Sequence, residues 1–96
     1  MYASVRRYWG MAPDAVDQIR QRRHEFEPLL RQVSGFRAWY MIGTDDGMIT
    51  VTLCDDRMGA EASVRVAGDY IRRNIPDLIP NPPEVSSGEV AAQIGG

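Results

Sequence analysis

The chain has 96 residues, of which 44% are hydrophobic, and its 13 acidic and 11 basic residues give a formal net charge of −2. This length suits one compact domain over residues 1–96, and the near-balanced charge favours neither a nucleic acid nor an anionic membrane as partner. A single cysteine excludes an internal disulfide, and no apolar run approaches the roughly 20 residues needed to cross a bilayer. We therefore expect a cytoplasmic protein, and because so small a domain buries little surface, self-association is a natural way to bury more.

Two elements are predicted in the first third of the chain. Residues 2–9 carry β-branched and aromatic side chains without a helical period, and Gly10 follows them, which predicts a strand. From Pro13 to Val33, apolar residues recur at helical spacing, which predicts a first helix. A kink or restart is expected at Pro28, because proline lacks the amide that would bond the preceding turn.

Residues 36–43 and 48–55 form the clearest strand pair, joined by a turn that ends in Asp-Gly. Pairing around this turn divides the side chains between two faces. The first face is hydrophobic and is expected to carry the helices, with the residues Ala38, Tyr40, Ile42, Ile49, Val51 and Leu53. The second face is mixed rather than polar, so a second copy of the chain is expected to cover it. Its candidate dimer-face residues are Trp39, Met41, Thr50, Thr52 and Cys54.

The second half of the chain completes a recognisable order of elements. A second helix is predicted from Arg57 to Asn74, where apolar residues again follow a helical period. Residues 75–88 hold four of the six prolines and predict an extended connector, and residues 88–94 alternate weakly, as in a fourth strand. The order βαββαβ predicts a ferredoxin-like α+β fold, with a four-stranded antiparallel sheet and two helices on one face.

Three stretches also resemble a known family: residues 1–10 (MYASVRRYWG), residues 28–63, which include SGFRAWYMIG and CDDRMGAEAS, and residues 74–90 (NIPDLIPNPPEVSSGEV). They look like the antibiotic biosynthesis monooxygenase-like domains of the dimeric α/β-barrel superfamily. The resemblance covers nearly the whole chain. It implies a homodimer in which two ferredoxin-like sheets pack into a barrel with the helices outside, and a small-molecule pocket between helices and sheet in each protomer.

The resemblance implies several activities, of which one is disfavoured here. The family includes cofactor-independent monooxygenases of aromatic polyketides, haem-degrading enzymes and quinol-related oxygenases. The haem-degrading members use an asparagine on the first strand, together with a tryptophan and a histidine associated with the second helix. Residues 2–9 contain no asparagine, residues 57–74 contain neither tryptophan nor histidine, and the one histidine is His24 on the first predicted helix. We therefore expect no bound cofactor.

The stretch from Cys54 to Asp56 places a thiol beside two carboxylates. A metal site would need further ligands, and no clustered histidine, cysteine or glutamate supplies them, so no metal is expected. Asp56 stands where the second helix begins and is expected to be its N-cap. Cys54 is expected to act as a small buried hydrophobic residue rather than as a reactive thiol.

Three residues are candidates for lining a ligand pocket: Arg23, Tyr40 and Tyr70. Arg23 could bind an anionic or enolic oxygen, or its stem could pack while its head reaches solvent. The two tyrosines could orient a small aromatic ligand, or fill the core while one hydroxyl finds a partner. Two functions therefore stay open: a cofactor-independent monooxygenase-like enzyme on a small aromatic or enolisable substrate, and a non-catalytic dimeric module for ligand binding or assembly.

Overall fold

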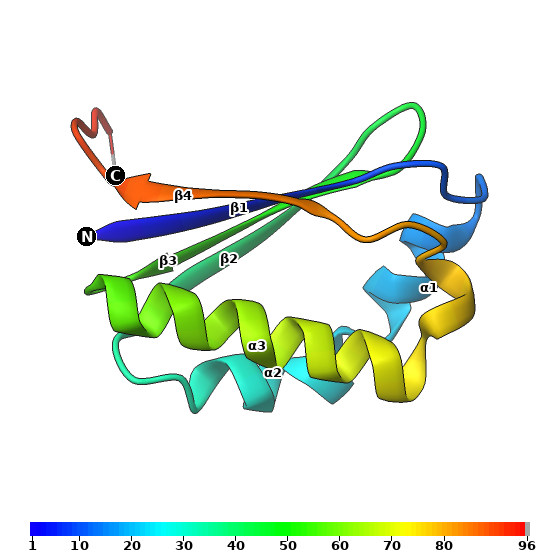
Figure 1. The fold of residues 1–96 in the computed structure, drawn as a ribbon, viewed down its shortest axis with the longest axis horizontal. Coiled ribbons are helices and arrows are strands. Elements are labelled where there is room, and N and C mark those ends of the chain that lie inside the picture. Colours follow the sequence, from blue (N-terminus) through cyan, green and yellow to red (C-terminus); the bar gives the residue numbers. More distant parts are fainter. Residues whose placement is uncertain (96) are drawn as a thin grey trace.

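A computed structural model describes residues 1–95. In chain order, the elements are β1 (Tyr2–Tyr8), α1 (Ala15–Gln21), α2 (Arg23–Arg31), β2 (Phe36–Gly43), β3 (Met48–Cys54), α3 (Arg57–Asn74), the 3-10 turn η1 (Pro76–Leu78) and β4 (Glu84–Glu89). The strands form one antiparallel sheet in the order β2-β3-β1-β4, and the helices lie against one of its faces (Figure 1). The predicted ferredoxin-like α+β fold is confirmed.

The strand order places β1 in the middle of the sheet, between β3 and β4. Tyr2 pairs with Cys54 on one side and with Glu89 on the other. The start of β1 lies beside the end of β4 (Figure 1), where the Val90 amide donates a hydrogen bond to the Met1 carbonyl (2.8 Å). Because β1 is central and covered by helices, its inward side chains are deeply buried, and this sets up the candidate site. Within residues 1–95, no helix is both long and apolar enough to cross a membrane.

Two elements differ from the sequence prediction. The first predicted helix is interrupted at Arg22, which separates α1 from α2, whereas Pro28 lies inside α2. Pro28 is on the exposed side of α2, where water can replace the amide that proline lacks. The last strand is β4 rather than residues 88–94, because pairing with β1 begins opposite Arg7 and ends opposite Tyr2.

The predicted dimer-face residues lie on the helix-covered face, so the assignment of the two faces was wrong. The buried ones are Thr50, Thr52 and Cys54. The other two, Trp39 and Met41, are partly buried and pack against the hydrophobic core. The physical reason is Arg6, which points from β1 toward the helices and donates to both threonine hydroxyls. A buried guanidinium needs acceptors beside it, so the threonines face inward although they are polar.

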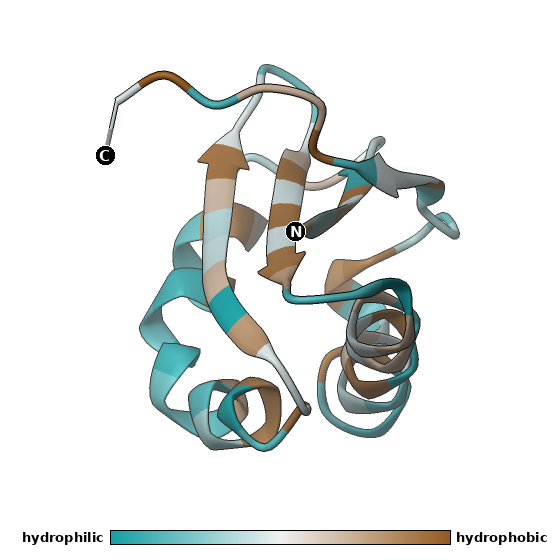
Figure 2. Ribbon diagram, turned by 90° about the vertical axis from the view of Figure 1, so that its left-hand side faces the viewer, coloured by the Kyte–Doolittle hydropathy of each residue, from teal (hydrophilic) through white to brown (hydrophobic). Residues whose placement is uncertain are grey.

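The face that was expected to carry the helices is the open face of the sheet. Tyr40 is 55% exposed and Ile42 is 49% exposed there. Val5 of β1 and Val51 of β3 are paired with each other on the same face and are only partly buried. Figure 2 shows the alternation of hydrophobic and less hydrophobic residues along the strands. This face is therefore largely apolar and uncovered in the single chain.

The helix α3 begins as predicted. Asp56 is its N-cap, and one carboxylate oxygen accepts a hydrogen bond from the Gly59 amide (2.9 Å). Asp55 instead forms a surface ion pair with Arg37. Cys54 is buried, and burial together with the two neighbouring carboxylates raises the pKa of its thiol. In residues 1–95, no three histidine, cysteine or acidic side chains gather in a way that could hold a metal ion.

Candidate functional site around Arg6

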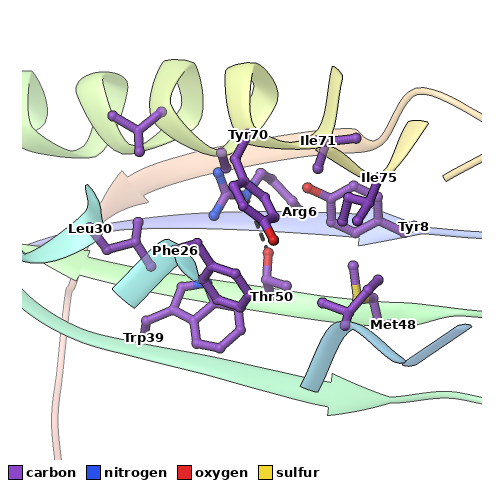
Figure 3. A pocket seen from close by; sticks show the side chains of 13 residues that line it. Arg6, Tyr8, Phe26, Leu30, Trp39, Met48, Thr50, Tyr70, Ile71 and Ile75 are labelled. Carbon is purple, nitrogen blue, oxygen red and sulfur yellow. Dashed lines mark hydrogen bonds between the residues drawn. The ribbon is translucent and has the colours of Figure 1, made fainter. Parts of the chain in front are cut away.

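A cavity of about 40 Å³ lies between the sheet and the helices, and we call it the central cavity. Side chains from every layer reach it, among them Arg6, Tyr8, Phe26, Trp39, Thr50 and Tyr70 (Figure 3). A volume of this size holds a water molecule or two but not an aromatic ring system, since small-molecule sites measure roughly 300–1,000 Å³. Its walls are mostly apolar.

Arg6 departs most from an ordinary core residue. It is only 2% exposed. Its Nε donates to the Thr50 hydroxyl (3.2 Å), one terminal nitrogen donates to the Thr52 hydroxyl (3.1 Å), and the other donates to the Ser63 carbonyl (3.2 Å). All three acceptors are neutral, and Arg6 forms no ion pair with any carboxylate in residues 1–95. The charge of Arg6 is therefore buried without a counter-ion.

This arrangement leaves Arg6 ready to bind a negatively charged oxygen. Burial lowers the pKa of the guanidinium, but arginine titrates so far above neutrality that it stays protonated. A guanidinium carries five N–H groups, and three hydrogen bonds leave two of them without a partner among the described residues. A buried charge without a counter-charge costs on the order of several kcal/mol, which neutral hydrogen bonds offset only in part. An anionic ligand would remove that penalty.

Tyr8 lies two residues from Arg6 on the same face of β1 and is also buried. Burial raises the pKa of its phenol, while the charge of Arg6 and a hydrogen bond with Thr50 act in the opposite direction. Tyr8 is therefore a neutral phenol next to a fixed positive charge. Such a pair can hold one oxygen of a ligand through a charged and a neutral donor.

An aromatic cluster forms the opposite wall of the central cavity. The ring of Phe26 packs edge-on against Trp39, with ring centres 5.1 Å apart, and tilted against Tyr70 at 5.3 Å. The Tyr70 hydroxyl donates to a carboxylate oxygen of Glu25 (2.6 Å). Burial, together with this hydrogen bond and the charge of Glu25, raises the pKa of Tyr70 to about 12. The hydroxyl therefore stays protonated and ties α3 to α2 across the cavity.

The Tyr70–Glu25 hydrogen bond predicts a dependence of stability on alkaline pH. An unfolded tyrosine loses its proton near pH 10, whereas folded Tyr70 keeps it to about 12, so the stabilisation is complete below pH 10 and is lost as the pH rises through 12. The wild type is expected to lose more free energy of unfolding than Tyr70→Phe between about pH 8 and about pH 11. Urea unfolding at both pH values measures this. Equal losses in the two proteins would contradict it.

The three residues predicted to line a pocket do not share one cavity. Tyr70 lines the central cavity. Arg23 and Tyr40 both line a separate groove of about 280 Å³ between α2 and the edge strand β2. Arg23 is exposed on α2, and Tyr40 belongs to the open side of the sheet. The structure thus brings Arg23 and Tyr40 together and separates them from Tyr70.

Sequence reasoning missed Arg6 and Tyr8, although one signal for Arg6 was present. Successive residues of a strand point to opposite faces of a sheet. The adjacent pair Arg6 and Arg7 in a strand therefore requires one arginine on each face. If that strand is central, one of the two arginines must be buried beneath the helices. The order of the strands, which decides whether β1 is central, is a tertiary property.

Comparison with solved structures shows the same fold in proteins of several kinds. A protein of unknown function from Nitrosomonas europaea has a TM-score of 0.69 at 20% identity, over 99% of this chain and 92% of its own. A monooxygenase from the gene ActVA-Orf6 of Streptomyces coelicolor, in complex with nanaomycin D, has a TM-score of 0.73 at 13% identity, over 99% and 91%. The haem degrader MhuD of Mycobacterium tuberculosis, with two haems in its active site, has a TM-score of 0.73 at 10% identity, over 99% and 100%.

These similarities concern the fold. A solved antibiotic biosynthesis monooxygenase shares it as well, with a TM-score of 0.64 at 14% identity. The expected resemblance to antibiotic biosynthesis monooxygenase-like proteins is thus confirmed at the level of three-dimensional structure. No family model matches the sequence, and no curated protein matches it significantly. The activity has to be argued from the site itself.

Proposed function

We propose that this protein is a cofactor-independent, monooxygenase-like enzyme that acts on a small aromatic or enolisable substrate bound at Arg6. The observation that carries the proposal is the buried guanidinium of Arg6, which has only neutral partners among residues 1–95 and lies beside the buried phenol of Tyr8. A positive charge in a water-poor site stabilises an oxygen that becomes negative during a reaction. The shared fold with the Streptomyces monooxygenase supports the same chemistry.

The proposed reaction begins with the formation of an enolate or phenolate at the site. When a water molecule takes a proton from a carbon next to a carbonyl group, negative charge moves onto the carbonyl oxygen, where Arg6 and Tyr8 donate hydrogen bonds. The electron-rich carbon then reacts with dioxygen. For a methylene substrate, the CH₂ group becomes a carbonyl group, one oxygen atom of O₂ enters the product, and the other leaves as water with the two hydrogens. Exclusion of water protects the reactive anion.

Oxygen consumption tests this proposal. The purified protein is expected to consume one O₂ for each carbonyl formed from the methylene group of an anthrone, above the rate without protein. An electrode and mass analysis of the product measure both quantities, and ¹⁸O₂ should place one label in the product. Uptake equal to background with all such compounds would count against an enzyme.

A second candidate function is a non-catalytic dimeric module for ligand binding or assembly. The small volume of the central cavity favours an assembly role over ligand binding in that cavity, because side chains fill most of the space between helices and sheet. Binding of an anthrone or quinol, measured by fluorescence, without oxygen uptake would select this second function. Turnover with a balanced yield would exclude it.

We also propose that the chain forms a homodimer through the open face of its sheet. Tyr40 and Ile42 are exposed there beside the partly buried Val5 and Val51. An apolar sheet face of this kind rarely stays in water. The surface differs from the one expected from the sequence, because the face that was assigned to the partner is filled by the helices.

Ile42→Glu is expected to convert the dimer into a folded monomer. The side chain is half exposed in the single chain, so the charge is tolerated there but would be buried without a partner in the dimer. Sedimentation equilibrium measures the mass, and circular dichroism checks the fold. Met58→Glu, at a 78% exposed apolar residue on α3, is the matched control and should stay dimeric. A wild type that is monomeric at its highest attainable concentration would contradict the proposal.

A further inference from the structure

A second and larger hollow adjoins the central cavity. It lies between α3 and residues 75–83, the part of the predicted connector that precedes β4. From here on we call these residues the connector, and the hollow the connector groove. Its volume is about 670 Å³, which falls within the usual range of small-molecule sites, roughly 300–1,000 Å³. Arg6 and Tyr8 line both the central cavity and the connector groove. The buried charge of Arg6 is therefore approached from the connector side through a hollow large enough for a ring system.

The connector groove carries an excess of positive charge. Arg6, Arg65 and Arg72 line it together with one acidic residue, Asp69, so three positive charges face one negative charge. Arg72 pairs with Asp69. Arg65 forms no ion pair with any residue that the structure describes. An anionic ligand is attracted to such a groove, with Arg65 at its rim and Arg6 at its floor.

The walls of the connector groove are apolar and well defined. Four prolines of the connector line one side: Pro76, Pro80, Pro82 and Pro83. The connector is attached to the end of β1 by a hydrogen bond from the Asn81 side chain to the Trp9 carbonyl (3.1 Å). Prolines have a fixed φ and no amide to satisfy, so they form a stiff and dry wall against which a planar ring can lie.

Gly68 forms part of the opposite wall, and packing does not require a glycine there. A Cβ atom at this position would meet only the end of the flexible Arg72 side chain (3.2 Å to one terminal nitrogen). A glycine inside a helix costs about 1 kcal/mol relative to alanine. The missing side chain leaves this wall of the groove open.

We propose that the connector groove is the site where the acidic part of an aromatic ligand binds, with its carboxylate or sulfonate at Arg65 and its ring against the prolines. The opposite end of the ligand then reaches Arg6 and Tyr8. This inference rests on the proposed function of Arg6 and names its substrate class, an aromatic compound that carries a separate acidic group. It also names the side from which the ligand reaches Arg6, which is the connector groove rather than the groove at Arg23.

Two fluorescent probes with the same ring system test the proposal. 1-Anilinonaphthalene-8-sulfonate is anionic, and N-phenyl-1-naphthylamine lacks the sulfonate. Arg65→Met is expected to weaken binding of the anionic probe by about threefold to fivefold, as for a partly exposed ion pair, and to leave the neutral probe unchanged. Higher ionic strength should weaken only the anionic probe. Gly68→Leu should weaken both probes by about tenfold or more, because its side chain occupies the groove.

Arg23→Met is the matched control, since it removes the same charge from the other groove, and neither probe should respond to it. Amide chemical shifts should change in residues 64–72 and in the non-proline residues of 76–83 when the anionic probe binds. Changes confined to the open sheet face or to the groove at Arg23, or equal effects of Arg65→Met and Arg23→Met, would overturn the proposal. These measurements do not depend on turnover. If the protein consumes no oxygen but binds the probes as expected, the proposed enzymatic activity is refuted and the proposed binding site in the connector groove is supported.

Discussion

Replacing Arg6 with methionine is expected to reduce turnover by at least about 100-fold, the effect of removing one donor to a developing oxyanion. The same change should alter the free energy of unfolding by no more than about 2 kcal/mol. Removing an unpaired buried charge stabilises the protein, while the hydroxyls of Thr50 and Thr52 lose a donor, and these effects oppose each other. Initial rates of oxygen uptake and urea denaturation measure the two quantities separately.

Arg7→Met is the matched control for this experiment. Arg7 is the next residue of β1, points to the open face, and forms only exposed ion pairs with Glu84 (3.5 Å) and Asp46 (3.9 Å). The Arg7→Met variant should keep full activity and most of the stability of the wild type. A purely structural Arg6 would give the reverse pattern: Arg6→Met would unfold at much lower urea concentration, while the folded fraction would turn over and bind ligands normally.

Replacing Phe26 with alanine is expected to have the largest effect on stability, about 3–5 kcal/mol. Phe26 is buried and is the only ring among residues 1–95 that contacts both other rings of the aromatic cluster, Trp39 and Tyr70. Each of these ring pairs adds about 0.5–1.5 kcal/mol beyond the area it buries. Because small domains are stable by only about 5–15 kcal/mol, the variant should be close to unfolding at room temperature.

The midpoint and slope of urea denaturation measure this loss. Leu29→Ala, on the exposed side of the same helix, is the matched control and should cost well under half as much, since Leu29 is 39% exposed. Phe26→Leu should recover much of the stability because it refills the space. A loss below about 1 kcal/mol for Phe26→Ala would show that the helices do not depend on the aromatic cluster.

Features that depend on neighbours in sequence were predictable. The bounds of α3 follow from a helical period that begins after Asp56, and that residue caps the helix as expected. The β2–β3 hairpin follows from two apolar runs around an Asp-Gly turn. The fourth strand was misplaced because residues 88–94 carry only a weak pattern, and the position of β4 is set by its pairing with β1.

Which face of the sheet packs against the helices was decided only by tertiary structure. A period of two residues divides Tyr40 from Trp39 and Val51 from Thr52, but it does not say which set meets the helices. Hydrophobicity pointed to the wrong set, because the polar Thr50 and Thr52 are acceptors for a buried arginine that comes from another strand. Arg6 is 44 residues from Thr50 and 46 residues from Thr52 in the chain, and it reaches them only when β1 pairs with β3.

The sequence by itself therefore determined the order of the elements, the bounds of the well-patterned ones and the cap of α3, since these depend on local spacing. Tertiary structure alone decided the site. The burial of Arg6 requires a central β1 and a covering α3, and the connector groove requires residues 76–83 to fold back over α3. Both depend on contacts between distant segments, which no short pattern encodes.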